Sequence, residues 1–126
     1  YSNLTSLGLV TMPPADGLDL LHGTLNLLIL KTLSWGPRHG LDVLQWIERT
    51  TREKLQIEEG ALYPALHRLE DKGWLDAEWG HTDAGRRAKF YRLTPAGRRQ
   101  LAAELTKWSS YTEAVALVVA AKGVRS

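Results

Sequence analysis

The chain has 126 residues, of which 44% are hydrophobic and 24% charged, a composition typical of one globular domain. It contains no cysteine, which excludes a disulfide scaffold, thiolate metal sites and thiol catalysis. The net charge is only +2, but residues 1–83 hold seven Lys/Arg against twelve Asp/Glu (−5), and residues 84–126 hold nine against two (+7). Such an imbalance suggests an anionic partner, with a solvated basic face as the alternative.

Residues 1–17 show no sustained periodicity and include Pro13-Pro14 and Gly17, which predicts a flexible segment. The single methionine is Met12. We expect the natural protein to start at Met12, so that residues 1–11 derive from an expression vector or from an upstream extension.

A first helix is predicted over residues 18–34, with Asp19 near its start and Trp35-Gly36-Pro37 ending it. Its leucine and isoleucine side chains occupy most sides of the helix, so more than one surface must cover them. We therefore expect a second covering surface, such as another subunit.

A second helix is expected from about His39 to Thr50. Helical spacing places three apolar side chains inward: Leu41, Leu44 and Ile47. In the polar stretch that follows, Leu55 and Ile57 alternate with polar residues, which predicts a very short strand.

A third helix is predicted from about Glu59 to Lys72, and Gly73 ends it. Its inward residues are spaced i, i+4, i+7: Leu62, Leu66 and Leu69. Pro64 is tolerated only near the beginning of a helix, because proline has no amide hydrogen to donate. The helix is therefore expected to begin about one turn before Pro64, near Glu59 or Gly60.

The pattern then changes to alternation, which predicts two strands, residues 74–79 and 88–93. Between them lies a basic loop, residues 80–87, with a glycine near each end, so the two strands form a hairpin with a long tip. Four tryptophans are expected to have core roles: Trp35, Trp46, Trp74 and Trp79.

Thr94-Pro95 begins a last helix, expected over residues 95–122, because threonine caps helices and proline suits the first helical position. Its apolar residues form one long stripe: Leu101, Leu105, Trp108, Val115 and Val119. No predicted element remains to cover this stripe, so a partner helix from a second copy is the simplest cover. The alternative is a helix that folds back on its own domain.

This order of elements describes a mainly α (α+β) fold: a winged helix-turn-helix with a two-stranded wing and a C-terminal dimerisation helix. The winged-helix domain would span residues 18–94. In such domains the third helix enters the DNA major groove, and the wing reaches flanking phosphates or the minor groove. Three basic residues stand in the expected wing: Arg86, Arg87 and Lys89.

Several motifs carry a resemblance to a known family. They are Gly23-Thr24-Leu25, Gly36-Pro37 with His39-Gly40, Gly60-Ala61-Leu62-Tyr63-Pro64-Ala65-Leu66, Arg68-Leu69-Glu70, Gly73-Trp74-Leu75, the wing residues Arg87, Lys89 and Tyr91, and Thr94-Pro95-Ala96-Gly97. On these residues the chain resembles the PadR-like family of bacterial transcriptional regulators, in its short form without a larger effector-binding domain.

The resemblance implies a dimeric, DNA-binding repressor whose last helix makes the dimer contact and whose Tyr63 faces DNA. The lack of cysteine fits the reducing cytoplasm, where we expect the protein to act. Two positions depart from the family pattern. Ala61 stands where a hydroxyl residue is common, which removes one hydrogen bond to DNA. His39 stands where an aromatic residue is common, which changes the packing around the second helix.

Two sets of site residues follow. The expected DNA contacts are Ala61, Tyr63, His67 and Arg68 on the third helix, with Arg86, Arg87 and Lys89 in the wing. The expected dimer contacts are Leu21, Leu25 and Leu28 with Leu101, Leu105, Trp108, Val115 and Val119. Three alternatives remain: a Tyr63 half-buried against the wing, a His67 without a role, and a pocket for a flat effector beside Trp108 instead of simple interface packing.

Other functional classes have little support. The four histidines are scattered without metal-ligand spacing, and neither a phosphate-binding loop nor a nucleophile elbow is present. We therefore expect no catalysis, no metal, no cofactor and no membrane span. The competing function is a winged helix that only binds proteins, with the basic wing contacting an acidic partner.

Overall fold

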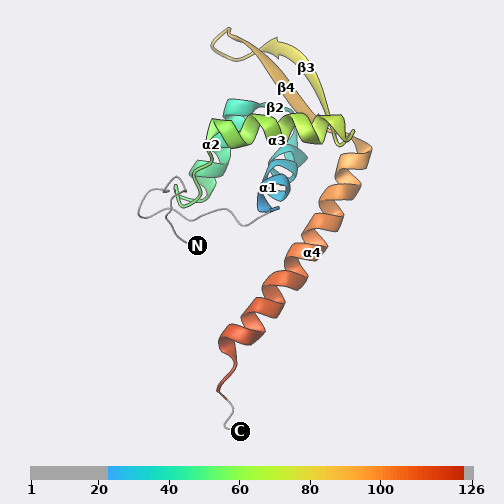
Figure 1. Cartoon of the computed structure of the whole chain (residues 1–126). Helices are drawn as coiled ribbons and strands as arrows, with labels where there is room; N and C mark the ends of the chain where they lie inside the picture. The colour runs from blue at the N-terminus through green and yellow to red at the C-terminus, as the bar shows by residue number, and fades with distance from the viewer. Residues whose placement is uncertain (1–22, 124–126) are drawn as a thin grey trace.

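The computed structural model describes residues 23–123. Its elements are α1 (Thr24–Thr32), the 3-10 helix η1 (Leu33–Trp35), β2 (Arg38–His39), α2 (Gly40–Thr50), α3 (Glu59–Asp71), β3 (Leu75–His81), β4 (Arg87–Leu93) and α4 (Pro95–Ala120). The first three α-helices form a body from which the β3–β4 hairpin projects at one end, while α4 extends away at the other (Figure 1). This arrangement confirms the predicted winged helix-turn-helix.

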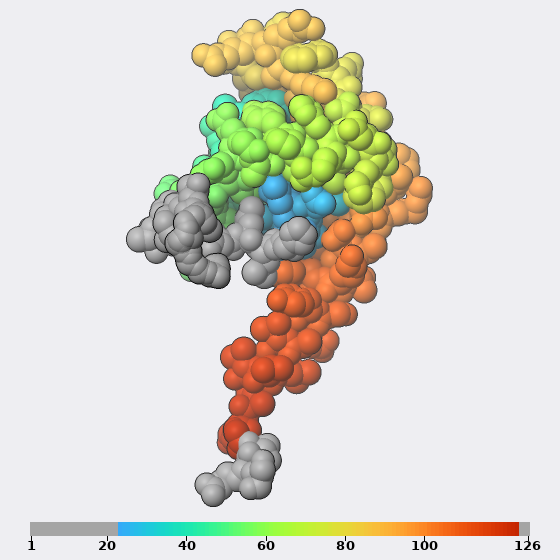
Figure 2. All heavy atoms as spheres, in the orientation of Figure 1, coloured from blue at the N-terminus to red at the C-terminus, as the bar shows by residue number. Residues whose placement is uncertain are grey.

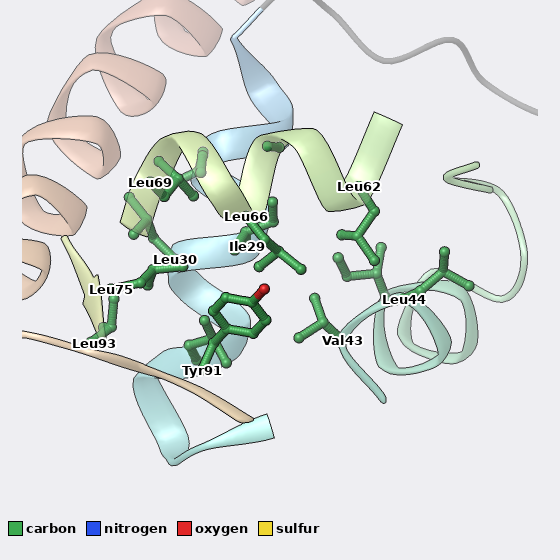
Figure 3. Packing of buried hydrophobic residues seen from close by; sticks show 14 of the residues in the cluster. Ile29, Leu30, Val43, Leu44, Leu62, Leu66, Leu69, Leu75, Tyr91 and Leu93 are labelled. Atoms are coloured by element: carbon green, nitrogen blue, oxygen red, sulfur yellow. The ribbon is translucent and has the colours of Figure 1, made fainter. Parts of the chain in front are cut away.

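The core lies between the body helices and the base of the hairpin (Figure 3). The three predicted inward residues of α3, Leu62, Leu66 and Leu69, are completely buried. They belong to one cluster with side chains from α1, α2 and the two hairpin strands, including Ile29 of α1 and Tyr91 of β4. Helix α3 begins at Glu59, as the position of Pro64 predicts.

The start of α4 is capped as predicted. The Thr94 hydroxyl accepts a hydrogen bond from the Gly97 amide (2.9 Å) and donates one to the Gly73 carbonyl (2.6 Å). The Thr94 amide donates to the Trp74 carbonyl (3.1 Å). This one residue therefore ties the beginning of α4 to the turn that follows α3.

Two local predictions are wrong. Leu41 is exposed, because Val43, Leu44 and Ile47 form the inward stripe of α2 and Leu41 lies outside it. Residues 51–58 form turns and coil instead of a short strand, since the Thr51 hydroxyl accepts the Leu55 amide hydrogen locally.

The sheet contains a strand that the sequence pattern did not predict. The strand order is β2-β4-β3, and β2 contributes only Arg38 and His39. Two residues are too few for alternation to be visible in a sequence. The hairpin strands also extend to His81 and Arg87, paired with each other, so the connecting wing tip is only residues 82–86.

The prediction of four core tryptophans holds for two of them. Trp46 and Trp74 are partly buried against the core, whereas Trp35 and Trp79 are 59% and 58% exposed. Trp35 packs against Trp46, with ring centroids 5.2 Å apart and ring planes tilted by 42°. Trp79 lies on the wing beyond the reach of the core.

None of the helices within residues 23–123 is long and apolar enough to cross a membrane.

Candidate nucleic-acid interface

An open hollow of about 460 Å³ separates the wing from α3 and the beginning of α2. Residues from all three elements line it: Leu41 from α2, Tyr63 and His67 from α3, and Arg86, Arg87 and Lys89 from the wing. The fold therefore brings together five of the seven residues expected to contact DNA. The exposed Leu41 at its rim gives the hollow an apolar edge that the sequence analysis missed.

The expected DNA contacts on α3 lie on two flanks of the helix. Successive residues of an α-helix are rotated by roughly 100°, so Tyr63, His67 and Glu70 (i, i+4, i+7) share the flank that faces the wing. Ala61 and Arg68 lie roughly 160° and 140° around the helix from Tyr63, on the opposite flank, and both are exposed. Ala61, which was expected to share one reading face with Tyr63 and His67, therefore lies on a different flank of α3 from them.

Tyr63 is half-buried, as the alternative expected, but the contact that the structure gives its ring is with α2 and not with the wing. Its ring lies against the beginning of α2, where a Cβ on Gly40 would come within 2.5 Å of its Cε1 atom. Gly40 thus makes the space in which Tyr63 sits. This burial raises the pKa of the Tyr63 phenol above its ordinary value, and the Glu59 carboxylate adds to the effect. The hydroxyl therefore stays protonated at neutral pH and remains a hydrogen-bond donor.

Two exposed cations stand at the end of the wing: Arg86 in the tip, residues 82–86, and Arg87 at the beginning of β4. The Thr82 amide donates to the Arg86 carbonyl (2.8 Å) and the Arg86 amide donates to the Thr82 hydroxyl (3.2 Å), which closes the turn around Gly85 at φ +84°. The Arg87 guanidinium lies 4.6 Å from the ring centroid of Trp79. Such stacking orients an arginine while leaving its N–H donors available.

Lys89 differs from the two arginines. Its ammonium donates to the Glu70 carboxylate of α3 at 3.0 Å, and both side chains are only about a third exposed. This hydrogen bond is the main reason why the pKa of Lys89 is raised. Sequence reasoning placed Lys89 with the free basic residues because the partner, Glu70, is nineteen positions away.

His39, a departure from the family pattern, has a local structural role. Its Nδ1 accepts a hydrogen bond from the Asp42 amide at 3.3 Å, which caps α2. Its ring meets Phe90 of β4 edge-on, with centroids 5.4 Å apart. His39 therefore holds the beginning of α2 beside the wing.

Within the described residues, no cluster of three or more histidine and acidic side chains is placed to hold a metal ion.

The predicted dimer surface divides along α4. Leu101 is 8% exposed and belongs to the core of its own chain, so the alternative of folding back applies to the first turns. Farther along the helix, four stripe residues are exposed: Leu105, Trp108, Val115 and Val119. Leu25 and Leu28 of α1 are half-buried. Leu21 lies outside the described residues.

The sequence profile described as the transcriptional regulator PadR-like family matches residues 29–103. A Lysinibacillus sphaericus protein described as uncharacterized protein X is 31% identical over 99 residues, which are 79% of this chain and 91% of that protein. Transcriptional regulator Rv3488 of Mycobacterium tuberculosis is 44% identical over 57 residues, which are 44% of this chain and 52% of that protein.

Solved structures give the same result. A PadR family transcriptional regulator from Eggerthella lenta is 29% identical with a TM-score of 0.68, and the match covers 79% of this chain and 85% of that one. A transcriptional regulator from Clostridium thermocellum is 28% identical with the same TM-score, over 74% and 90% of the two chains. The profile match covers more than half of the chain, and these relatives share its winged-helix fold. The chain belongs to the PadR-like family of transcriptional regulators.

Proposed function

We propose that this chain is a sequence-specific DNA-binding repressor that acts as a homodimer on a near-palindromic operator. The observation that carries the proposal is the hollow between α3 and the wing, because half-buried Tyr63, exposed His67 and two exposed arginines converge on it. Helix α3 would lie in the major groove, while Arg86 and Arg87 would contact the phosphates beside it.

Base reading would come from two flanks of α3. On the wing side, Tyr63 and His67 carry a hydroxyl and an imidazole that hydrogen-bond base edges or phosphates. On the opposite flank, Arg68 carries the guanidinium that most often reads guanine, and Ala61 offers only an apolar contact. Tyr63→Ala or His67→Ala is therefore expected to change the preference between DNA sites.

The dimer would use the exposed stripe of α4. Two copies would place their α3 helices one helical turn of DNA apart, ~34–36 Å, which makes the operator two-fold symmetric. We assign Trp108 to this contact and not to an effector pocket. Its ring packs on Tyr111 of the same exposed helix, with centroids 6.1 Å apart, so the two rings together offer a broad apolar surface to a partner helix.

The experiment begins with fragments of the host genome captured by the purified protein and sequenced. The recovered fragment and a scrambled version of it are then compared in salt-dependent binding assays. A repressor binds the recovered fragment at least 10³-fold tighter than the scrambled one. Equal affinities for the two DNAs would overturn the proposal and favour a module that binds an acidic protein.

The wing is tested separately with Arg86→Ala/Arg87→Ala. This variant is expected to bind all DNA sequences more weakly and to reduce the slope of log K against log salt by up to ~2. The matched control is Lys107→Ala/Lys122→Ala. It removes two exposed cations that lie away from the wing, one within α4 and one just after its end. An unchanged slope in the wing variant, or an equal change in the control, would remove the wing from the interface.

A further inference from the structure

We propose that Lys89 is a positioning residue: its ion pair with Glu70 clamps the wing to α3, and the phosphate contacts of the wing belong to Arg86 and Arg87. The proposal rests on the DNA-binding function proposed above. It removes one residue from the expected set of phosphate contacts and adds the acidic residue Glu70 to the machinery that shapes the interface.

The first observation is the pair itself. Among the described residues, three ion pairs form, and Lys89–Glu70 is the one that joins the wing to α3. Its N–O distance is 3.0 Å with side chains 31% and 33% exposed. The pair Arg92–Asp76 joins the two hairpin strands instead, at 3.9 Å with both side chains more than half exposed. Lys89 is therefore the better shielded cation, and its charge is balanced locally.

The second observation is a gradient along one face of β4. Arg87, Lys89 and Tyr91 alternate along the strand, so their side chains point to the same side. Tyr91 is 2% exposed and belongs to the core, Lys89 is partly covered, and Arg87 is exposed. The Lys89 ammonium lies 5.4 Å from the centre of the Tyr91 ring. Along this face of β4, Tyr91 is therefore fixed in the core, Lys89 is held by Glu70, and the exposed Arg87 is available to contact a ligand.

The third observation explains why a clamp is needed. Beyond Tyr91 and its cross-strand partner Ala77, neither strand contributes a side chain to the core. Strand β2 pairs with β4 only at Tyr91 and Phe90, so past Phe90 the wing is a two-stranded hairpin, which without further support is only marginally stable. The Glu70–Lys89 pair is placed just past the last core contact, where it limits movement of the wing relative to α3. The distance between the α3 flank and the two arginines depends on that orientation.

The test uses the full chain and three variants: Glu70→Gln, Lys89→Met and the double variant. Binding to the operator fragment is measured across salt concentrations. The clamp predicts that Glu70→Gln weakens binding about two- to fivefold, although removal of a negative charge near DNA would strengthen it by electrostatics alone. Lys89→Met should weaken binding by a similar factor without changing the salt slope, and the double variant should be no weaker than either single variant.

The matched control removes the other hairpin pair with Asp76→Asn/Arg92→Met, on the opposite face of the strands. Like the double variant, it removes one negative and one positive charge, but neither residue contacts α3. The orientation of the wing relative to α3 should therefore be unchanged. A salt slope reduced by about one in Lys89→Met, or unchanged or tighter binding in Glu70→Gln, would overturn the clamp and return Lys89 to the phosphate contacts. Exchanging the pair, Glu70→Lys/Lys89→Glu, should recover part of the affinity lost in Lys89→Glu alone.

A second readout needs no DNA. Amide hydrogen exchange at Ala88 to Phe90 should be faster in Glu70→Gln and Lys89→Met than in the wild type, and unchanged in the control. Equal exchange in all variants would overturn the clamp even if DNA binding is established. Faster exchange combined with no preference for any genomic fragment would instead retain the clamp and overturn the proposed DNA-binding function.

Discussion

The body and the far part of α4 place the same types of residue in opposite environments. In the body, leucine and isoleucine side chains from α1, α2, α3 and the strands bury one another almost completely. Beyond Tyr111, the last residue of α4 that lines a hollow with α1, the helix projects clear of the body (Figure 2) and leaves large apolar side chains exposed, with Val118 and Val119 at 77% and 78%. Apolar surface is stabilising only when it leaves water. The body therefore buries most of its apolar side chains within one chain, whereas the far part of α4 leaves its own exposed to the second copy that we propose as its partner.

The largest expected effect tests the body. Leu66→Ala removes a side chain with no exposed surface and leaves a cavity between α3 and its neighbours. We expect the free energy of unfolding to fall by about 2–5 kcal/mol, measured by urea denaturation. The matched variant Leu117→Ala, in the exposed part of α4, should change it by less than about 0.5 kcal/mol. Equal losses would show that α4 is as deeply buried in the folded assembly as the body is.

The junction between the two regions is tested by Gly97→Ala. A Cβ at this position would overlap the Trp74 carbonyl oxygen and lie 3.1 Å from Leu93, so the backbone must shift. We expect a loss of about 1–3 kcal/mol in thermal or urea unfolding. Gly60→Ala in α3 is the control, because nothing lies within 4 Å of the added methyl. It should raise stability by about 0.5–1 kcal/mol, and a loss comparable to that of Gly97→Ala would contradict the role of close packing.

The partner of α4 is tested by Val115→Asn and Leu117→Asn. Val115 belongs to the stripe, whereas Leu117 is rotated from it by roughly 200°. If one helix face pairs with a second copy, Val115→Asn should raise the dimer dissociation constant about tenfold in sedimentation experiments, because it buries an unsatisfied amide. Leu117→Asn should leave it unchanged. Dissociation by both variants would mean that the end of α4 is covered on all sides.

The smallest expected effect is the pH dependence of the body. Burial raises the pKa of Tyr91 above 10.0, burial does the same for Tyr63, and the Glu70 hydrogen bond raises that of Lys89 above 10.5. Each group therefore holds its proton more tightly in the folded state. The protonated groups therefore contribute fully to the stability of the folded state below about pH 10. This contribution is lost as the pH rises through the pKa values of the folded state. Urea denaturation should show falling stability above about pH 10, and rising stability there would contradict these shifts.

The elements of the body could be predicted because their signals are local. The i, i+4, i+7 spacing of Leu62, Leu66 and Leu69 defined the buried face of α3, and Thr94-Pro95 defined the beginning of α4. The errors arose where the spacing was ambiguous or the element too short. In α2, Leu44 and Ile47 can form an inward stripe with either Leu41 or Val43, and the spacing alone does not decide between them. Strand β2 was missed because it contains only two residues.

The candidate site was predictable in its composition but not in its geometry. The basic residues of the wing and the exposed residues of α3 could be identified from charge and spacing. The different roles of Arg87 and Lys89 could not, because one stacks on Trp79 across the hairpin and the other meets Glu70 on another element. Residues with the same charge and adjacent positions on one strand face look equivalent in a sequence.

The sequence by itself determined the order of the main helices and of the two hairpin strands, the winged-helix class, the family and the location of the positive charge. These properties depend on periodicity, capping and composition, which act over a few neighbouring residues. Only the tertiary structure decided which side of α3 faces the wing, that Leu101 belongs to the body, and that the +7 excess of residues 84–126 includes a cation already paired with α3. Those properties depend on contacts between residues far apart in the chain, which become neighbours only when the body has packed.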